Sequence, residues 1–143
     1  MFRQLNDRIF ASPQIGLAEV AEAAAMGIGL IINNRPEQES DDQTPGAAIE
    51  AAAHAAGISY VAIPVTHAGF SEGQVKAMMA ALAATDASVL AYCRSGTRST
   101  LLWALVEASS GADPEELTTM ARQAGYDLAP IRAMLDVLAA RQD

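Results

Sequence analysis

The residues of this chain best suited to chemistry are its lone cysteine and the polar residues directly after it. They read Cys93-Arg94-Ser95-Gly96-Thr97-Arg98-Ser99. An apolar run at residues 88–92 precedes the cysteine and a helical pattern follows it, so we expect the sulfur to lie over the first turn of a helix. Backbone amides there lack partners within the helix, and the helix dipole adds partial positive charge. Both favour a thiolate, and the segment therefore predicts a nucleophilic cysteine in an anion-binding loop.

Three residues of this loop suit the binding of an anionic substrate. Arg98 offers a planar fork of donors to a tetrahedral oxyanion, and its positive charge also favours the thiolate. Gly96 permits a backbone turn that a Cβ would obstruct, so the amides can curl around an anion. Arg94 is a second cation, expected to hold the anionic group of the substrate. We predict Cys93 and Arg98 as the catalytic residues.

Three hydroxyl residues complete the predicted loop, namely Ser95, Thr97 and Ser99. Ser99 is the first candidate for a hydrogen bond from a hydroxyl to the sulfur, and Thr97 is the second. The alternative interpretation is that Cys93 is an ordinary small hydrophobe at the end of a strand. That interpretation leaves the surrounding arginines, hydroxyls and glycine unexplained, so the catalytic one is preferred.

Residues on two other loops are accessory candidates. Arg35 could hold a substrate anion, or it could form a structural salt bridge with the acidic segment that follows it. His67 belongs to a residue type that can exchange protons near neutral pH, and it could protonate a leaving group or be an exposed residue without a catalytic role. Asp41 and Asp42 are lesser candidates for that acid. One cysteine and two scattered histidines offer no ligand cluster, so neither a metal nor another cofactor is expected.

Alternating patterns predict the elements that position these loops. Apolar, β-branched runs at residues 28–32, 58–65 and 88–92 predict buried strands, and a short strand is expected near Ile9 and Phe10. Helices are predicted from spacing and caps at these places: 17–24 closed by Gly27, 47–56 closed by Gly57, 71–82 with a Ser71–Gln74 capping box, from about Arg98, from Asp113-Pro114, and from Pro130.

This order of strands and helices predicts the fold class. Strand and helix in alternation imply right-handed crossovers and a three-layer α/β/α fold, with a mainly parallel central sheet of four to five strands. Ligands of such sheets bind at the carboxyl ends of the strands. Residues 33–46, 66–70 and 93–98 fall there. The first of these stretches is acidic and looks mobile, which fits either a lid or a solvated loop.

Length and composition set wider bounds. The 143 residues, 51% of them hydrophobic, predict one domain over residues 1–143. A net charge of −8 argues against a nucleic-acid or anionic-membrane partner. A lone cysteine suits a reducing compartment, and the absence of a signal-like or membrane-spanning run predicts a cytoplasmic protein. A homodimer is left open.

The motifs together resemble a known family. The cysteine loop is similar both to the active loop of rhodanese-type sulfurtransferases and to the phosphate loop of cysteine-dependent phosphatases. With Asn33-Asn34-Arg35-Pro36 and Ile63-Pro64-Val65, the chain resembles the phosphatase-like domain of beta-lactamase-hydrolase-like proteins over residues 2–143. The resemblance implies a dual-specificity-phosphatase-like fold, and either persulfide transfer or phosphate-ester hydrolysis. Some members are fused to a metallo-hydrolase domain of the persulfide-dioxygenase kind, which points toward sulfur.

Two features of the sequence favour sulfur transfer within that family. Only four residues separate Cys93 from Arg98, whereas the related phosphatases usually have one more, and a tighter loop encloses a smaller anion. Those phosphatases also protonate the leaving alcohol with an aspartic acid after the preceding strand, and residues 64–70 contain no carboxylate before Glu72.

We therefore predict a sulfurtransferase that moves a sulfane sulfur from thiosulfate or a small persulfide through a Cys93 persulfide to a thiol acceptor. The alternative is a cysteine-dependent phosphatase that acts through a Cys93 phosphothiolate. A second alternative is a non-catalytic module that binds an anion or a partner.

Overall fold

The computed structural model describes residues 1–141 around a central five-stranded sheet. Its strands lie in the order β1-β2-β5-β3-β4. Only β1 is antiparallel to its neighbour, and the other three pairings are parallel. The strands are β1 (Arg3–Gln4), β2 (Ile9–Ser12), β3 (Ile28–Asn33), β4 (Ser59–Ala62) and β5 (Ser88–Tyr92). The predicted mainly parallel sheet is confirmed, and the short edge strand β1 is an addition to it.

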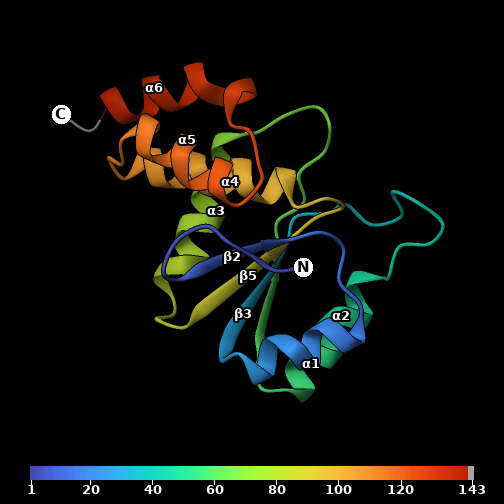
Figure 1. The fold of residues 1–143 in the computed structure, drawn as a ribbon. Coiled ribbons are helices and arrows are strands. Elements are labelled where there is room, and N and C mark those ends of the chain that lie inside the picture. The colour runs from blue at the N-terminus through green and yellow to red at the C-terminus, as the bar shows by residue number, and fades with distance from the viewer. Residues whose placement is uncertain (142–143) are drawn as a thin grey trace.

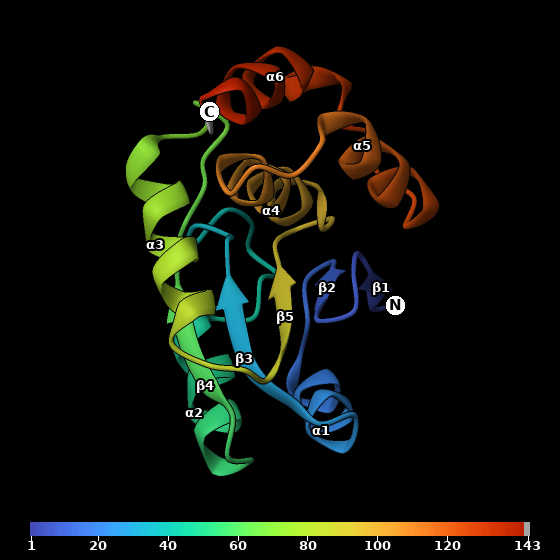
Figure 2. The ribbon, with the colours of Figure 1, turned by 90° about the vertical axis from the view of Figure 1, so that its left-hand side faces the viewer.

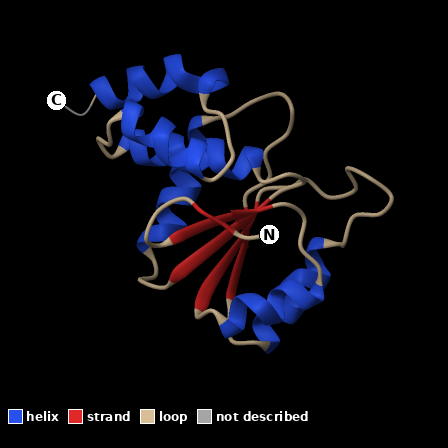
Figure 3. Ribbon diagram, in the orientation of Figure 1, coloured by secondary structure: helices blue, strands red, loops and turns tan. Residues whose placement is uncertain are grey.

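Helices cover both faces of this sheet, as Figures 1 and 3 show. Two helices pack on one face, α1 (Leu17–Ala25) and α2 (Gly46–Ala55). The other face carries α3 (Glu72–Ala83), α4 (Thr97–Ser109), α5 (Pro114–Gln123), the short 3-10 turn η1 (Ala129–Ile131) and α6 (Arg132–Ala140). The three-layer α/β/α architecture expected from the sequence is therefore confirmed.

The alternation of side chains along the central strands builds two cores. Ile31 and Leu90 point to the side of α1 and α2, whereas Ile32 and Val89 point to the side of α3 to α6. All four are fully buried. Successive residues of a strand face opposite sides of the sheet, so runs that are apolar throughout mark strands covered on both faces. Trp103 of α4 is also fully buried, in the second core.

Two element boundaries differ from those predicted. The apolar run 58–65 is paired as a strand only over Ser59–Ala62, although the amides of Ile63 and Val65 still donate to the carbonyls of Asn33 and Asn34. Pro64 lies between these two donors and faces the open edge of the sheet, where its missing N–H breaks no bond to β3. Pro130 does not open the last helix, because it lies inside η1 and α6 begins at Arg132.

The helix caps agree with the sequence where local chemistry sets them. Ser71 Oγ accepts from the amide of Gln74, whose side chain accepts from the amide of Ser71 in return, which is the predicted capping box. Gly27 follows α1 with a φ of 83°, a left-handed conformation that suits glycine. Across residues 1–141, no helix is long and apolar enough to cross a membrane.

The strand that carries the cysteine lies in the middle of the sheet. β5 is inserted between β2 and β3, both of which precede it in the chain (Figure 2). Its carboxyl end is tied to both neighbours. The amide of Cys93 donates to Ser12 O at 3.3 Å, and the amide of Asn34 donates to Tyr92 O at 2.8 Å. The ends of three parallel strands therefore meet beside Cys93.

Candidate active site

Cys93 is held at the bottom of a short loop between β5 and α4. Its side chain is fully buried, and its Sγ accepts a hydrogen bond from the amide of Gly96 at 3.1 Å. A hydrogen bond to a sulfur favours the form that carries negative charge. The strand, the loop and the start of the helix thus place the sulfur where the sequence predicts it.

Gly96 gives the loop its shape. Its φ of 94° is in the left-handed region, which residues with a Cβ rarely adopt. A Cβ at this position would also lie 2.1 Å from the hydroxyl oxygen of Tyr126. That hydroxyl donates to the carbonyl of Ser95 at 3.2 Å. The loop is therefore clamped from outside by a residue of the connection between α5 and η1.

Arg98 is held in a network of two arginines and one carboxylate. Its two terminal nitrogens donate to the Glu39 carboxylate, at 2.7 Å from Nη1 and 2.8 Å from Nη2. Nη1 also donates to Val65 O at 2.6 Å. The bonds from Arg98 and then Arg35 lower the pKa of Glu39 from 4.5 to about 2, although burial opposes them. The same bond to Glu39, opposed by burial and followed by the charge of Cys93, raises the pKa of Arg98.

Arg35 is the second arginine of this network. It is buried, with 4% of its surface exposed. Its Nε donates to Glu39 at 2.9 Å, its Nη1 to the Gln14 side chain at 2.9 Å and its Nη2 to Ser40 Oγ at 3.0 Å. The salt bridge to the acidic segment, one of the two interpretations of Arg35, is therefore confirmed. All three of its side-chain nitrogens donate within the protein.

Ser99 does not donate to the sulfur as the sequence suggested. Its hydroxyl is buried and donates to the Asn34 side chain at 2.8 Å. The same asparagine donates from Nδ2 to Ile63 O at 2.9 Å. Ser99 thus joins the start of α4 to the ends of β3 and β4. Its side chain supports the loop from behind, because its only hydroxyl hydrogen is used by Asn34.

The remaining loop residues are exposed. Ser95 Oγ donates to Thr97 Oγ1 at 2.9 Å and accepts from the amide of Thr97 at 3.3 Å, which closes a small turn. The Arg94 side chain is exposed, and its carbonyl accepts from the amide of Gln14 at 3.1 Å. Ser95, Thr97 and Arg94 therefore form the outer rim of the loop.

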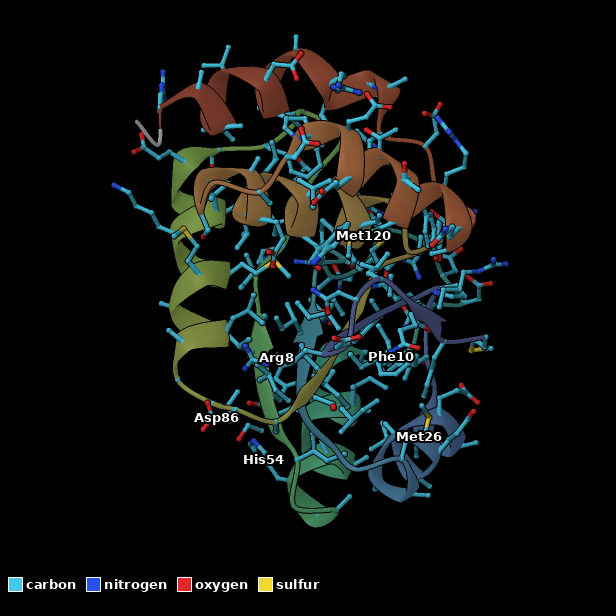
Figure 4. All side chains as sticks on the ribbon, turned by 60° about the vertical axis from the view of Figure 1, so that its left-hand side comes forward. Arg8, Phe10, Met26, His54, Asp86 and Met120 are labelled. Carbon is cyan, nitrogen blue, oxygen red and sulfur yellow. The ribbon has the colours of Figure 1, made fainter. Side chains whose placement is uncertain are left out.

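Among the candidate acids on other loops, Asp42 is linked to the arginine network, because Ser40 Oγ accepts from Arg35 and donates to Asp42 Oδ1 at 2.6 Å. His67 is exposed in the connection between β4 and α3. Asp41 and Asp42 are exposed as well, and a hydrogen bond from Ser40 lowers the pKa of Asp42. His54 lies in the last turn of α2, and Figure 4 shows it at the end of the molecule away from α5 and α6. Within residues 1–141, none of these four side chains forms a hydrogen bond or salt bridge with residues 93–98.

Two residues of the site were missed at the level of sequence. Glu39 lies in the acidic segment, and its spacing of four residues from Arg35 is a signal that could have found it. Tyr126 lies 31 residues after Ser95, on an element that nothing in the local sequence connects with the loop. Among residues 1–141 no cluster of three or more His, Cys, Asp or Glu residues could hold a metal ion. The expected absence of a cofactor stays a prediction.

The arrangement supports attack by sulfur on an electrophile that carries an anionic group. Cys93 supplies the sulfur, and the Gly96 amide and the Arg98 guanidinium supply positive charge beside it. The Glu39 carboxylate fixes the plane of that guanidinium through its two hydrogen bonds. Among residues 1–141, no comparable set of hydrogen-bonded side chains holds a group in the connection between β4 and α3 that could protonate the leaving group.

Sequence comparison places this site in a family. A family model described as beta-lactamase hydrolase-like protein, phosphatase-like domain, matches residues 1–110. The chain belongs to this family. A beta-lactamase hydrolase-like protein from Xylella fastidiosa is 36% identical over 125 residues, which make up 87% of this chain and 29% of the relative. The chain thus spans less than a third of the length of such curated relatives.

Solved structures agree with this assignment. A candidate phosphatase from Neisseria meningitidis is 33% identical and superposes with a TM-score of 0.82, over 95% of this chain and 96% of the other. The TpbA protein of Pseudomonas aeruginosa, a cysteine-to-serine variant in complex with phosphotyrosine, superposes with a TM-score of 0.68 at 15% identity, over 98% of this chain and 88% of the other. The second likeness concerns the fold alone. The phosphatase-like domain expected from the motifs is confirmed.

Proposed function

We propose that this domain hydrolyses phosphate monoesters with Cys93 as nucleophile, and that aryl phosphates are its substrate class. The observation that carries the proposal is the buried Cys93 sulfur beside the Gly96 amide and the Arg98 guanidinium, in a member of a phosphatase-like family. This choice reverses the order of the two enzymatic interpretations drawn from the sequence, because family and fold favour the phosphatase.

The reaction has two steps. In the first, the Cys93 thiolate attacks phosphorus, the S–P bond forms, the ester P–O bond breaks, and the leaving oxygen departs with the electron pair. In the second, water attacks the phosphothiolate, the S–P bond breaks, and inorganic phosphate and the thiolate are released. Arg98 and the loop amides stabilise the charge on the phosphoryl oxygens in both transition states.

The leaving group decides which esters fit. No carboxylate lies between Pro64 and Phe70 to protonate it, and Glu39 is ionised because its pKa is about 2. A phenol departs as a phenoxide far more readily than an alcohol departs as an alkoxide. Aryl phosphates therefore need less help from a general acid than alkyl phosphates do. The phosphotyrosine bound by the TpbA relative belongs to the aryl class.

Sulfur transfer is the second candidate, and one observation favours it. Four residues separate Cys93 from Arg98, so the loop is short for a phosphoryl group. In this reaction the thiolate attacks the sulfane sulfur of thiosulfate, the S–S bond of the donor breaks, and sulfite leaves with the electron pair. A thiol or cyanide then removes the sulfur from the Cys93 persulfide. No alkoxide forms in either step, so no acid is required.

One set of measurements tests the proposal. The protein is incubated with a series of aryl phosphates that differ in the acidity of the phenol, with an alkyl phosphate, and with thiosulfate plus cyanide. Turnover and the mass of the Cys93 peptide are followed, with Cys93→Ser as the matched control. We expect a phosphate adduct on Cys93, rates that fall steeply as the phenol becomes less acidic, and negligible alkyl phosphate turnover.

Other outcomes have definite meanings. Thiocyanate formation that requires Cys93, without aryl phosphate turnover, would overturn the phosphatase proposal in favour of sulfur transfer. A flat dependence on the phenol would contradict the absence of a general acid. If neither substrate class modifies Cys93, the domain is a binding module.

A further inference from the structure

Tyr126 reaches the cysteine through a single peptide unit. Its hydroxyl donates to the carbonyl of Ser95 at 3.2 Å. The amide of Gly96, which belongs to the same peptide group, donates to Cys93 Sγ at 3.1 Å. The three groups form one chain: hydroxyl, peptide, sulfur. A donor on the carbonyl oxygen of a peptide polarises that peptide and makes its N–H a stronger donor, so consecutive hydrogen bonds strengthen one another.

We propose that Tyr126 is a positioning residue that stabilises the Cys93 thiolate through the Ser95–Gly96 peptide. The inference rests on the proposed role of Cys93 as nucleophile, and it holds for either of the two group-transfer reactions. It assigns a function to a residue outside the segment that matches the family model, because that match covers residues 1–110 and Tyr126 lies beyond it.

The surroundings of Tyr126 keep its hydroxyl in place. The Arg3 guanidinium lies 5.9 Å from the centroid of its ring, and Arg3 Nη1 donates to Ala124 O at 3.0 Å. The edge strand β1 therefore holds the connection that carries Tyr126. Burial raises the pKa of the Tyr126 hydroxyl, Arg3 opposes this, and the nearby charge of Cys93 adds to it. The hydroxyl thus remains a donor at neutral pH.

Space also favours this arrangement. A Cβ at Gly96 would lie 2.1 Å from the Tyr126 hydroxyl oxygen and 2.9 Å from its Cζ. The tyrosine can therefore approach the peptide only because residue 96 is glycine. The amide of the same glycine donates to the sulfur, and its left-handed φ of 94° directs the chain away from this peptide into α4. One glycine thus serves both ends of the hydrogen-bonded chain.

Other charged groups near the sulfur must be separated from this effect. They are Arg94 in the loop, Arg98 at the start of α4, Arg35 and Glu39 after β3, and Arg3 behind the tyrosine ring. None of them is altered when the Tyr126 hydroxyl alone is removed. The variant Tyr126→Phe does this and retains the ring.

The test uses the fact that the chain has a single cysteine. Protein labelled with carbon-13 at the cysteine Cβ gives one resonance, whose shift reports conversion of thiol to thiolate without a substrate or reagent. We expect the midpoint of this titration to rise by about half a pH unit in Tyr126→Phe. The amide nitrogen resonance of Gly96 should follow the titration in the unaltered protein and respond less in the variant.

The matched control is Tyr60→Phe. Its hydroxyl accepts a hydrogen bond from the Asn33 side chain at 2.9 Å and forms no hydrogen bond with residues 93–98. We expect the titration midpoint of this variant to equal that of the unaltered protein. An unchanged midpoint in Tyr126→Phe, with an unchanged thermal melting curve, would overturn the proposal. Equal shifts in both variants would do the same, because they would indicate a general effect of losing a tyrosine hydroxyl.

Because the titration uses no substrate, it separates this proposal from the proposed function. A protein that fails to hydrolyse aryl phosphates can still show the midpoint shift. Conversely, a protein that hydrolyses them with an unshifted midpoint in Tyr126→Phe would retain the function and lose this inference.

Discussion

Two loops at the carboxyl edge of the sheet differ sharply in how they are held. The loop from Cys93 to Arg98 is fixed by bonds from four separate parts of the chain, namely Gln14, Glu39, Val65 and Tyr126. In the connection from Thr66 to Phe70, the side chains of residues 66–68 are exposed, and its bonds run from Ala68 and Gly69 back to Thr66. The first loop would organise attack by sulfur, and the second is where a leaving group would be protonated. The hydrogen bonds of this site therefore hold the nucleophile in place, and far fewer of them hold the loop beside the leaving group.

The largest expected effect comes from removing the nucleophile. We predict that Cys93→Ser lowers turnover of aryl phosphate by more than about 10⁴-fold, because a serine hydroxyl is not ionised in this loop. Steady-state rates with a chromogenic aryl phosphate measure this. If the variant retained a tenth of the activity, Cys93 would not be the nucleophile and the catalytic site would lie elsewhere.

Arg98 should give the next largest effect. In Arg98→Lys the charge remains and the planar fork is lost, so the bonds to Glu39 and to the phosphoryl oxygens cannot form together. We expect a loss of about 10²-fold in kcat/KM. Arg94→Lys is the matched control, because the Arg94 side chain is exposed, and its loss should stay within about threefold. Equal losses in the two variants would contradict the role of the Arg98 guanidinium in binding the phosphoryl oxygens.

Glu39 should affect both activity and stability. Glu39→Gln removes the charge that fixes Arg98, and we expect about a tenfold loss of kcat/KM. Asp41→Asn, an exposed neighbour in the same segment, should change it by less than about twofold. A gain of activity in Glu39→Gln would show instead that the carboxylate competes with the substrate for Arg98.

The pH dependence of stability follows from the lowered pKa of Glu39. A folded-state pKa of about 2, against 4.5 in the unfolded chain, stabilises the fold fully above pH 4.5, and this stabilisation is lost as the pH falls toward 2. We expect about 1–2 kcal/mol, since the side chain is 16% exposed and solvent screens part of the effect. Urea unfolding at several pH values measures it. The difference between unaltered protein and Glu39→Gln should shrink on acidification, and a constant difference would contradict the assignment.

The smallest effect belongs to the exposed loop. Because the His67 side chain is exposed and forms no hydrogen bond with the cysteine loop, we expect His67→Ala to change aryl phosphate turnover by less than about twofold across the neutral pH range. A loss of tenfold or more, together with the disappearance of an ionisation from the pH–rate profile, would make His67 the general acid. The connection from Thr66 to Phe70 would then supply the group that protonates the leaving oxygen.

The sequence could predict what local chemistry decides. The Cys93 loop, the Ser71–Gln74 capping box and the buried strands 28–33 and 88–92 all depend on residues close together in the chain. The strand predicted at 58–65 is shorter and less buried than expected, because β4 lies at the edge of the sheet, and its position there depends on pairing with the distant β3.

Long-range contacts explain what the sequence could not predict. Ser99 and Asn34 are 65 residues apart, and nothing in either neighbourhood indicates that the hydroxyl turns away from the sulfur. Arg98 and Glu39 are 59 residues apart, and they meet because β3 and β5 are neighbours in the sheet. Sequence periodicity specifies which face of a strand is buried but leaves open which side chains converge at its end.

The central position of β5 also has a consequence for folding. β2 and β3 come earlier in the chain, and β5 occupies the gap between them. Non-local pairing of this kind forms slowly compared with local helices, because a long loop must close first. Within residues 1–141, β2 pairs with β1 and β5, and β3 pairs with β4 and β5, so the two halves of the sheet join when β5 pairs with both. The step that completes the sheet is therefore the same step that carries Cys93 to the point where the strand ends meet.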